Sequence, residues 1–157
     1  MKHRASNNAP PPHTHTHSTA DSHRYTDVAG IAQQPTSAGY ASLLLWPRVT
    51  NHEALPAAAG ELLTVRGLVT VRWENNTAAF ALAAEVPANA VAEVRLPFPV
   101  GTAADALVAT EGGVVVYAGG SFKPSVPGVT GAAVDAATGT LRVSVGSGSY
   151  AFELSGW

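Results

Sequence analysis

The chain contains no cysteine. This absence excludes a disulfide framework, thiolate metal ligands and a cysteine nucleophile. It does not assign a compartment, because secreted proteins can also lack cysteine. The fold must therefore be held together by packing and hydrogen bonds alone.

Charge is also scarce in this sequence. Charged residues make up 13% of the 157 residues, and the formal net charge is −2. Soluble domains usually contain about 25% charged residues. Nothing in this balance supplies the basic surface that nucleic acids or anionic membranes attract. We therefore expect neither nucleic acid nor a membrane as a partner.

Long apolar runs are missing as well. No stretch approaches the ~18 consecutive apolar residues that span a bilayer. The basic start, Met1 to Arg4, is followed by polar residues rather than by the apolar core of a secretory signal. The sequence therefore predicts no signal peptide and leaves the localisation unknown, with the cytoplasm as the default expectation.

The first 24 residues form a His/Pro/Thr-rich segment without Val, Leu, Ile or Phe. Such a segment cannot bury enough apolar surface to offset its ordering entropy, so we predict a disordered tail over 1–24. Within it, His13, His15 and His17 alternate with threonine, and imidazoles can bind zinc or nickel. A disordered arm has no surrounding shell to orient such ligands. We therefore predict no metal site and no cofactor.

Residues 25–38 have an intermediate composition, and we interpret them as a connector. Gly30 is placed to end a short helical turn, and Pro35 interrupts the stretch that follows.

From Gly39 to the end, apolar residues recur with period two rather than 3.6. Short strands separated by Gly, Pro and Asn are typical of a β-sandwich. We therefore predict an all-β, antiparallel β-sandwich domain over 39–157. The expected strands cover 40–46, 68–73, 80–84, 91–96, 114–117, 141–145 and 150–154.

Alternation also assigns the faces of these strands. Val69, Val71 and Trp73 share one face, and we expect Trp73 in the core. Ala92, Val94 and Leu96 are expected inside, with Glu93 and Arg95 outside. Two turns complete the pattern: Asn75–Asn76 is predicted as a two-residue hairpin turn, because Asn tolerates positive φ, and 146–149 as a hairpin loop.

Catalytic groups are harder to find. Paired carboxylates could serve hydrolysis, but Glu74, Glu85, Glu93 and Glu153 take the outward parity of their strands or lie at strand ends, and nothing in the spacing brings two together in a pocket. The acidic residues considered are Glu53, Glu61, Glu74, Glu85, Glu93, Asp105, Glu111, Asp135 and Glu153. His52 with Glu53 or Asp105 could be drawn as part of a triad, but no G-x-S-x-G elbow accompanies it. We predict no catalytic residue.

Aromatic side chains leave a carbohydrate-binding interpretation open. Trp46 ends a leucine-rich strand and is expected mainly in the core, whereas Trp157, the last residue, could be exposed. If a sugar platform exists, Trp46, Tyr117 and Trp157 are its candidates.

Several motifs in order resemble the C-terminal β-sandwich domain of bacterial-type α-L-rhamnosidases, glycoside hydrolase family 78. They are the strand Gly67 to Trp73, the turn Val86-Pro87-Ala88-Asn89 and the strand Ala92 to Pro97. The ending, Gly146 to Phe152, is similar to the closing hairpin of that family. The stretch 27–31 is like the last turn of the helical barrel that precedes the sandwich. The resemblance covers about residues 25–155.

The resemblance implies an accessory role. In that family the hydrolytic carboxylates belong to an (α/α)6 barrel, so no catalytic residue carries over to this chain. We therefore expect a non-catalytic domain that packs against and stabilises a glycoside hydrolase barrel. Alternatives are a free-standing carbohydrate-binding module, or a rhamnosidase fragment that acts only with a separate barrel. An apolar face left without the barrel could also drive self-association.

Overall fold

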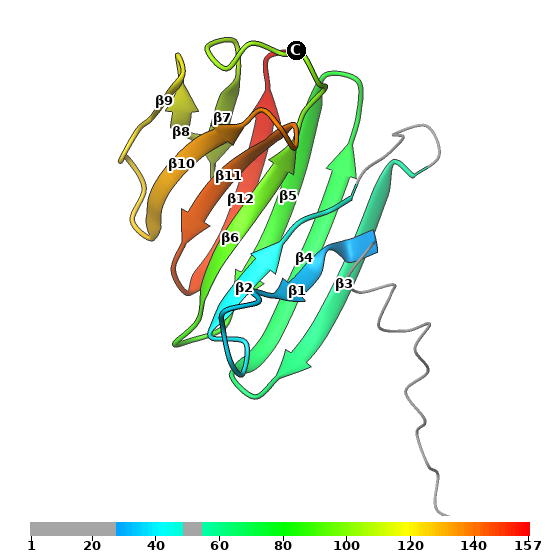
Figure 1. Cartoon of the computed structure of the whole chain (residues 1–157), viewed down its shortest axis with the longest axis vertical. Helices are drawn as coiled ribbons and strands as arrows, with labels where there is room; N and C mark the ends of the chain where they lie inside the picture. Colours follow the sequence, from blue (N-terminus) through cyan, green and yellow to red (C-terminus); the bar gives the residue numbers. More distant parts are fainter. Residues whose placement is uncertain (1–27, 49–54) are drawn as a thin grey trace, which may run out of the picture.

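The computed structural model describes residues 28–48 and 55–157; apart from the helical residues Val28 and Ala29, every regular element in these residues is a β-strand. The strands form two sheets that stack face to face (Figure 1). The predicted all-β sandwich is therefore confirmed. The predicted tail over 1–24 lies outside the described residues.

One sheet has five strands, in the order β1-β2-β6-β11-β10, and the other has seven, in the order β3-β4-β5-β12-β7-β8-β9. All neighbours are antiparallel except β2 and β6, which run parallel. The five-stranded sheet consists of β1 (Ile31–Gln33), β2 (Ser42–Leu45), β6 (Val91–Pro97), β11 (Thr140–Val145) and β10 (Val129–Asp135). The seven-stranded sheet consists of β3 (Ala57–Thr64), β4 (Gly67–Asn75), β5 (Ala79–Val86), β12 (Gly148–Ser155), β7 (Val108–Glu111), β8 (Val114–Ala118) and β9 (Ser121–Phe122).

The core lies between the two sheets and follows the predicted alternation. Val69, Val71 and Trp73 are at most 1% exposed, and Ala92, Val94 and Leu96 are also buried. The Trp73 indole stacks on Phe80 with ring centroids 6.0 Å apart. Its Nε1 donates to the Val28 carbonyl at 2.9 Å, so the buried N–H is satisfied.

The turn after β4 differs from the prediction. Asn75 remains in the strand and pairs with Phe80, so the loop consists of residues 76–78. The Asn76 side-chain oxygen accepts hydrogen bonds from the N–H groups of Ala78 and Ala79. Among the described residues, positive φ outside glycine occurs only at Tyr40 and Asn89. The prediction of a two-residue turn was wrong, because the loop is longer and the Asn76 side chain stabilises it by hydrogen bonds.

The sandwich also starts before Gly39. Ile31–Gln33 forms the edge strand β1 and pairs with β2, within the stretch predicted as a connector. Gly30 has φ +79°, and a Cβ there would overlap the backbone of Trp46 and Pro47. The Trp46 N–H donates to the Gly30 carbonyl at 2.7 Å. Gly30 thus lets the chain enter the sheet close to the end of β2.

Arg66 ties three loops together at one end of the sandwich. It lies in the β3–β4 turn, and its guanidinium donates to the carbonyls of Gly39 at 3.0 Å and Asn89 at 2.8 Å. Asn89, with φ +60°, belongs to the turn between β5 and β6. The Val-Pro-Ala-Asn motif therefore has a structural role: it presents a carbonyl to Arg66.

Candidate functional surfaces

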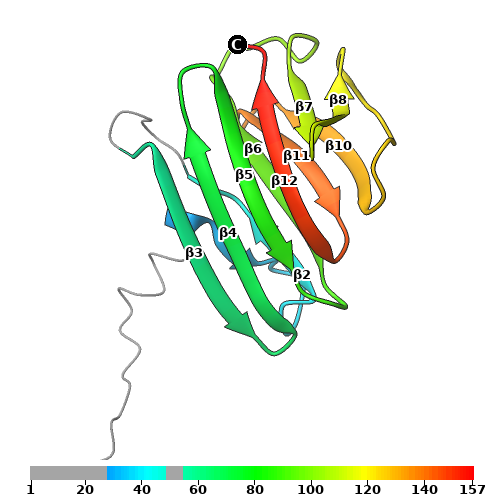
Figure 2. The same cartoon turned by 180° about the vertical axis from the view of Figure 1, so that it is seen from behind.

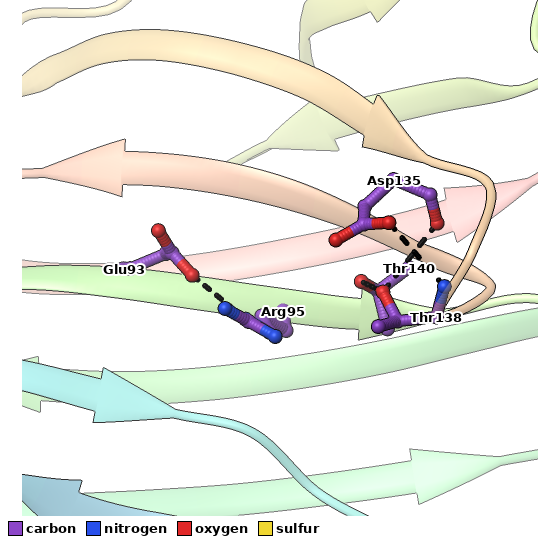
Figure 3. A network of polar contacts seen from close by, with 5 residues as sticks. All are labelled: Glu93, Arg95, Asp135, Thr138 and Thr140. Atoms are coloured by element: carbon purple, nitrogen blue, oxygen red, sulfur yellow. Dashed lines mark hydrogen bonds and ion pairs between the residues drawn. The ribbon is translucent and has the colours of Figure 1, made fainter. Parts of the chain in front are cut away.

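Glu93 and Arg95 form an ion pair on the outer face of the five-stranded sheet. Both side chains point outward from β6, and Arg95 Nε lies 2.7 Å from Glu93 Oε1 (Figure 3). The side chains of Arg95 and Glu93 are only 18% and 22% exposed. The outward parity was predicted correctly, but these charges are largely covered rather than freely solvated.

Trp46 lies over this ion pair. Leu43 and Leu45 point into the core, and Trp46 follows with the opposite parity of β2. The Cζ atoms of Arg48 and Arg95 lie 4.1 and 4.3 Å from the centre of the Trp46 ring. Guanidiniums at this distance are attracted to the face of an indole. Trp46 is thus half-buried outside the sheet, and its expected place in the core was wrong.

A second polar cluster closes the β10–β11 hairpin. The Thr138 N–H donates to the Asp135 carboxylate at 3.3 Å, and the hydroxyls of Thr138 and Thr140 are 2.8 Å apart (Figure 3). Burial alone would raise the pKa of Asp135. Hydrogen bonds from Thr138, the Arg142 charge and the Ala137 N–H outweigh it and lower that pKa. These contacts join residues of one hairpin, so the cluster stabilises the turn between β10 and β11.

Two shallow hollows lie on the outer face of the seven-stranded sheet, which Figure 2 shows from this side. In each hollow, alanine side chains lie among charged ones. The first encloses about 600 Å³ over Ala81, Ala83 and Ala151, with Glu74 and Glu153 among its lining residues. The second encloses about 460 Å³. Glu61 and Glu85 line the second hollow, and Arg72 and Ala83 are shared by both.

Each hollow brings two carboxylates onto neighbouring parts of one surface. Glu74 on β4 and Glu153 on β12 both pair with Ala81 on β5, so their backbones are about 10 Å apart, two strand spacings. The expectation that no two carboxylates share a hollow was wrong. The pairing of β12 with β5 brings together residues that are far apart in sequence.

The chemistry of the first hollow favours hydrogen bonding over acid catalysis. Glu74 pairs with Arg72 at 2.9 Å, and the two side chains are 57% and 71% exposed. Glu74 is held by a guanidinium and is open to solvent. Such a carboxylate can accept hydrogen bonds from hydroxyl groups, and no apolar pocket surrounds it.

The three aromatic candidates do not form one platform. Tyr117 on β8 is 2% exposed; burial raises its pKa, and Asp105 raises it further. Trp157 is half-buried against the core, and the Trp46 ring is contacted by the guanidiniums of Arg48 and Arg95. The stacked aromatic pairs found among residues 28–48 and 55–157 are Trp73–Phe80 and Tyr150–Phe152. Neither pair includes a candidate.

Other candidates from the sequence lie elsewhere. His52, Glu53 and the histidines of the tail are outside the described residues. Within the part that the structure does describe, no three His, Asp or Glu side chains gather as a metal site would require. That part also has no helix long and apolar enough to cross a membrane.

The fold and its surfaces define a β-sandwich domain with a complete core and solvent-facing charges on both outer faces. The model of the family "Bacterial alpha-L-rhamnosidase C-terminal domain" matches residues 30–107. An alpha-L-rhamnosidase of Streptomyces avermitilis is 34% identical over 73 residues, which are 46% of this chain and 7% of that protein.

Solved structures agree. The alpha-L-rhamnosidase of Dictyoglumus thermophilum aligns with 87% of this chain at a TM-score of 0.67 and 24% identity, which covers 13% of that chain. The Streptomyces avermitilis alpha-L-rhamnosidase, solved with L-rhamnose, aligns with 83% at a TM-score of 0.56 and 27% identity, covering 10% of that chain. The resemblance seen in the strand motifs is therefore confirmed: the sandwich is similar to the C-terminal domain of bacterial alpha-L-rhamnosidases. It spans only a small part of the relatives it matches.

Proposed function

We propose that this chain is a non-catalytic accessory domain that packs against and stabilises the catalytic part of a glycoside hydrolase. The observation that carries the proposal is the extent of the match. The chain corresponds to the C-terminal sandwich of alpha-L-rhamnosidases and to 7–13% of the length of the matched proteins.

The interior of the domain supports this role. Its inner faces are filled by a continuous set of buried apolar side chains. The described side chains include no buried polar atom that lacks a hydrogen-bond partner. A domain packed in this way can act as a rigid support, because closely packed cores transmit strain rather than absorb it.

Activity of the purified chain tests the non-catalytic part of the proposal. We expect no hydrolysis of an aryl α-L-rhamnoside. Glu74→Gln and Glu153→Gln are the informative variants, because these two carboxylates share the larger hollow. Turnover that is lost in either variant would assign catalysis to this face and overturn the proposal.

A glycan-binding module is the second candidate, and the hollows of the seven-stranded sheet favour it. Their carboxylates and Arg72 could hydrogen-bond sugar hydroxyls. The aromatic contribution is weaker: a sugar could stack on Trp46 only by displacing a guanidinium, and Tyr117 is buried.

A glycan screen separates the two candidates. The module predicts affinity that is lost in Glu153→Gln or Trp157→Ala, with Trp46→Ala as a test of the other sheet. We expect no binding in any variant. Hydrolysis that appears only after a separate catalytic chain is added would instead identify a fragment that works in a two-chain enzyme.

A further inference from the structure

The open edges of the two sheets are not equally protected. A free strand edge presents unpaired N–H and C=O groups to other chains, and proteins usually block it with short strands, lysine, proline or bulges. Edge strand β9 has two residues and β1 has three, while β10 carries a register shift between Val129 and Gly131. The strand β10 also lies against β8 and β9, which closes that side of the sandwich (Figure 1).

The strand β3 has none of these protections. It has eight residues, pairs with β4 without a register shift and contains no lysine or proline. It forms the outer edge of the seven-stranded sheet (Figure 2). Its single charged residue is Glu61. Within the described part of the chain, β3 is the one long, regular and unblocked edge.

The hydrogen-bonding direction of each β3 residue follows from one contact. The Asn75 N–H donates to the Pro56 carbonyl at 2.7 Å, so these two residues form a hydrogen-bonded antiparallel pair. Such pairs recur every second residue, which directs the backbone groups of Ala58, Gly60 and Leu62 toward β4. The backbone groups of the alternate residues, Ala57, Ala59, Glu61 and Leu63, therefore face the open edge.

We propose that β3 pairs with β3 of a second copy of this chain, antiparallel about Gly60, and joins two seven-stranded sheets. This register pairs Ala57 with the partner's Leu63 and Ala59 with the partner's Glu61. It satisfies all four outward-facing residues on each strand through about eight new backbone hydrogen bonds. Because both copies use the same surface, the pairing is closed and stops at a dimer.

The apolar side chains at the ends of β3 favour a second copy over an unrelated strand. Leu63 is 79% exposed, Val65 in the hairpin turn is 88% exposed and Leu55 before the strand is 39% exposed. Pairing about Gly60 brings the Leu63 end of each strand to the Ala57 end of the other. The exposed residues of the turn then meet the partner's exposed Leu55, so the edge is complementary to itself.

The charge of Glu61 makes the proposed dimer sensitive to salt. In this register the two Glu61 side chains are diagonal neighbours, about 7–8 Å apart at their backbones. Their repulsion is screened by salt. The dimer should therefore tighten when salt is added or when Glu61 is changed to Gln.

Sedimentation of the full 157-residue chain from about 1 µM to about 1 mM tests the pairing, since this range covers weak to moderate association. The variant Ala59→Pro removes an N–H that faces the open edge and no bond to β4. We expect it to weaken association about tenfold or more, because the symmetric dimer loses two hydrogen bonds, one from each copy.

Leu63→Lys is the second variant, because it changes an exposed side chain and keeps the backbone. Val100→Lys is its matched control, since Val100 is 88% exposed in the loop after β6. We expect Leu63→Lys to weaken the dimer and Val100→Lys to leave it unchanged. A chain that stays monomeric throughout, or a dimer that neither Ala59→Pro nor Leu63→Lys weakens, overturns the proposal.

Engineered cysteines test the register, because the natural chain has none. Hydrogen-bonded antiparallel pairs have Cα atoms about 5.5 Å apart, within disulfide range. A mixture of Ala57→Cys and Leu63→Cys chains should cross-link, whereas Ala57→Cys mixed with Glu61→Cys should cross-link more slowly. The reverse preference contradicts pairing about Gly60.

Discussion

Two ion pairs of the same design lie on the outer faces of the two sheets. Arg72 and Glu74 are two residues apart on β4, and Glu93 and Arg95 are two residues apart on β6, with N–O distances of 2.9 and 2.7 Å. The first pair is more than half exposed, but the second is about one fifth exposed, and the Trp46 ring lies against its Arg95. The surrounding side chains, rather than the pair itself, decide how much each contributes to stability.

The largest effect is expected at Trp73, the inward neighbour of the exposed pair on β4. Trp73→Ala should lower the free energy of unfolding by about 3–5 kcal/mol, because it opens a cavity in the core. Trp73→Phe is the matched control: it keeps an aromatic ring against Phe80, loses the bond to Val28 and leaves a much smaller cavity than Trp73→Ala. Denaturant unfolding measures both variants. Equal losses would mean that the cavity is not the dominant cost.

The second-largest effect is expected at Arg95, and it distinguishes the contributions of the two ion pairs to stability. Arg95→Ala leaves Glu93 partly buried without its partner and uncovers one face of Trp46, so we expect a loss of about 2 kcal/mol. Arg72→Ala should cost about 0.5 kcal/mol or less, since exposed pairs contribute little. Added salt should reduce the second loss and hardly change the first. Similar losses of stability from Arg95→Ala and Arg72→Ala would contradict the idea that burial beside Trp46 makes the Glu93–Arg95 pair the more important one.

The next effect is expected at Tyr150, whose buried hydroxyl connects two loops by neutral hydrogen bonds rather than by an ion pair. Its OH lies 3.2 Å from the Gly146 carbonyl and 3.4 Å from that of Gly128. Tyr150→Phe should cost about 1 kcal/mol, the net value of one hydrogen bond. Thermal and denaturant unfolding of this variant should agree on a loss between those of Arg95→Ala and Arg72→Ala.

The smallest effect is a pH dependence at Asp135, on the turn of the five-stranded sheet. Its pKa is lowered from the ordinary value of 3.8, so its charged form favours the folded state. That contribution is fully present above the ordinary value and is lost as pH falls through the lower folded-state pKa. Asp135→Asn should therefore reduce stability at pH 7 and make no difference at the acid end. A deficit that persists in acid would point to a steric cause.

The strands with strong alternation could be predicted from the sequence. Val69, Val71 and Trp73 on β4 and Ala92, Val94 and Leu96 on β6 combine large and regularly spaced apolar residues, and all are buried. The strand β10 was missed because it lies at an edge and is built from small residues, with only Val129 fully buried. Such a strand leaves little periodic signal in the sequence.

The surfaces were less predictable because they depend on pairing between distant strands. In the run Leu43-Leu44-Leu45-Trp46 every residue is apolar, so alternation could not decide which ones face inward. The Trp46 ring lies against Arg95 only because β2 pairs with β6. Likewise, Glu74 and Glu153 share a hollow only because β12 pairs with β5.

The most direct test of the accessory role is a chimera. The segment of the Streptomyces avermitilis alpha-L-rhamnosidase that matches this chain would be replaced by residues 28–157, and the thermal midpoint and rhamnoside hydrolysis would be compared with those of the truncated enzyme. We expect the chimera to regain stability by several degrees and to recover activity, and the same chimera with Trp73→Ala to do neither. A chimera no more stable than the truncated enzyme would contradict the proposal that this domain supports a catalytic partner.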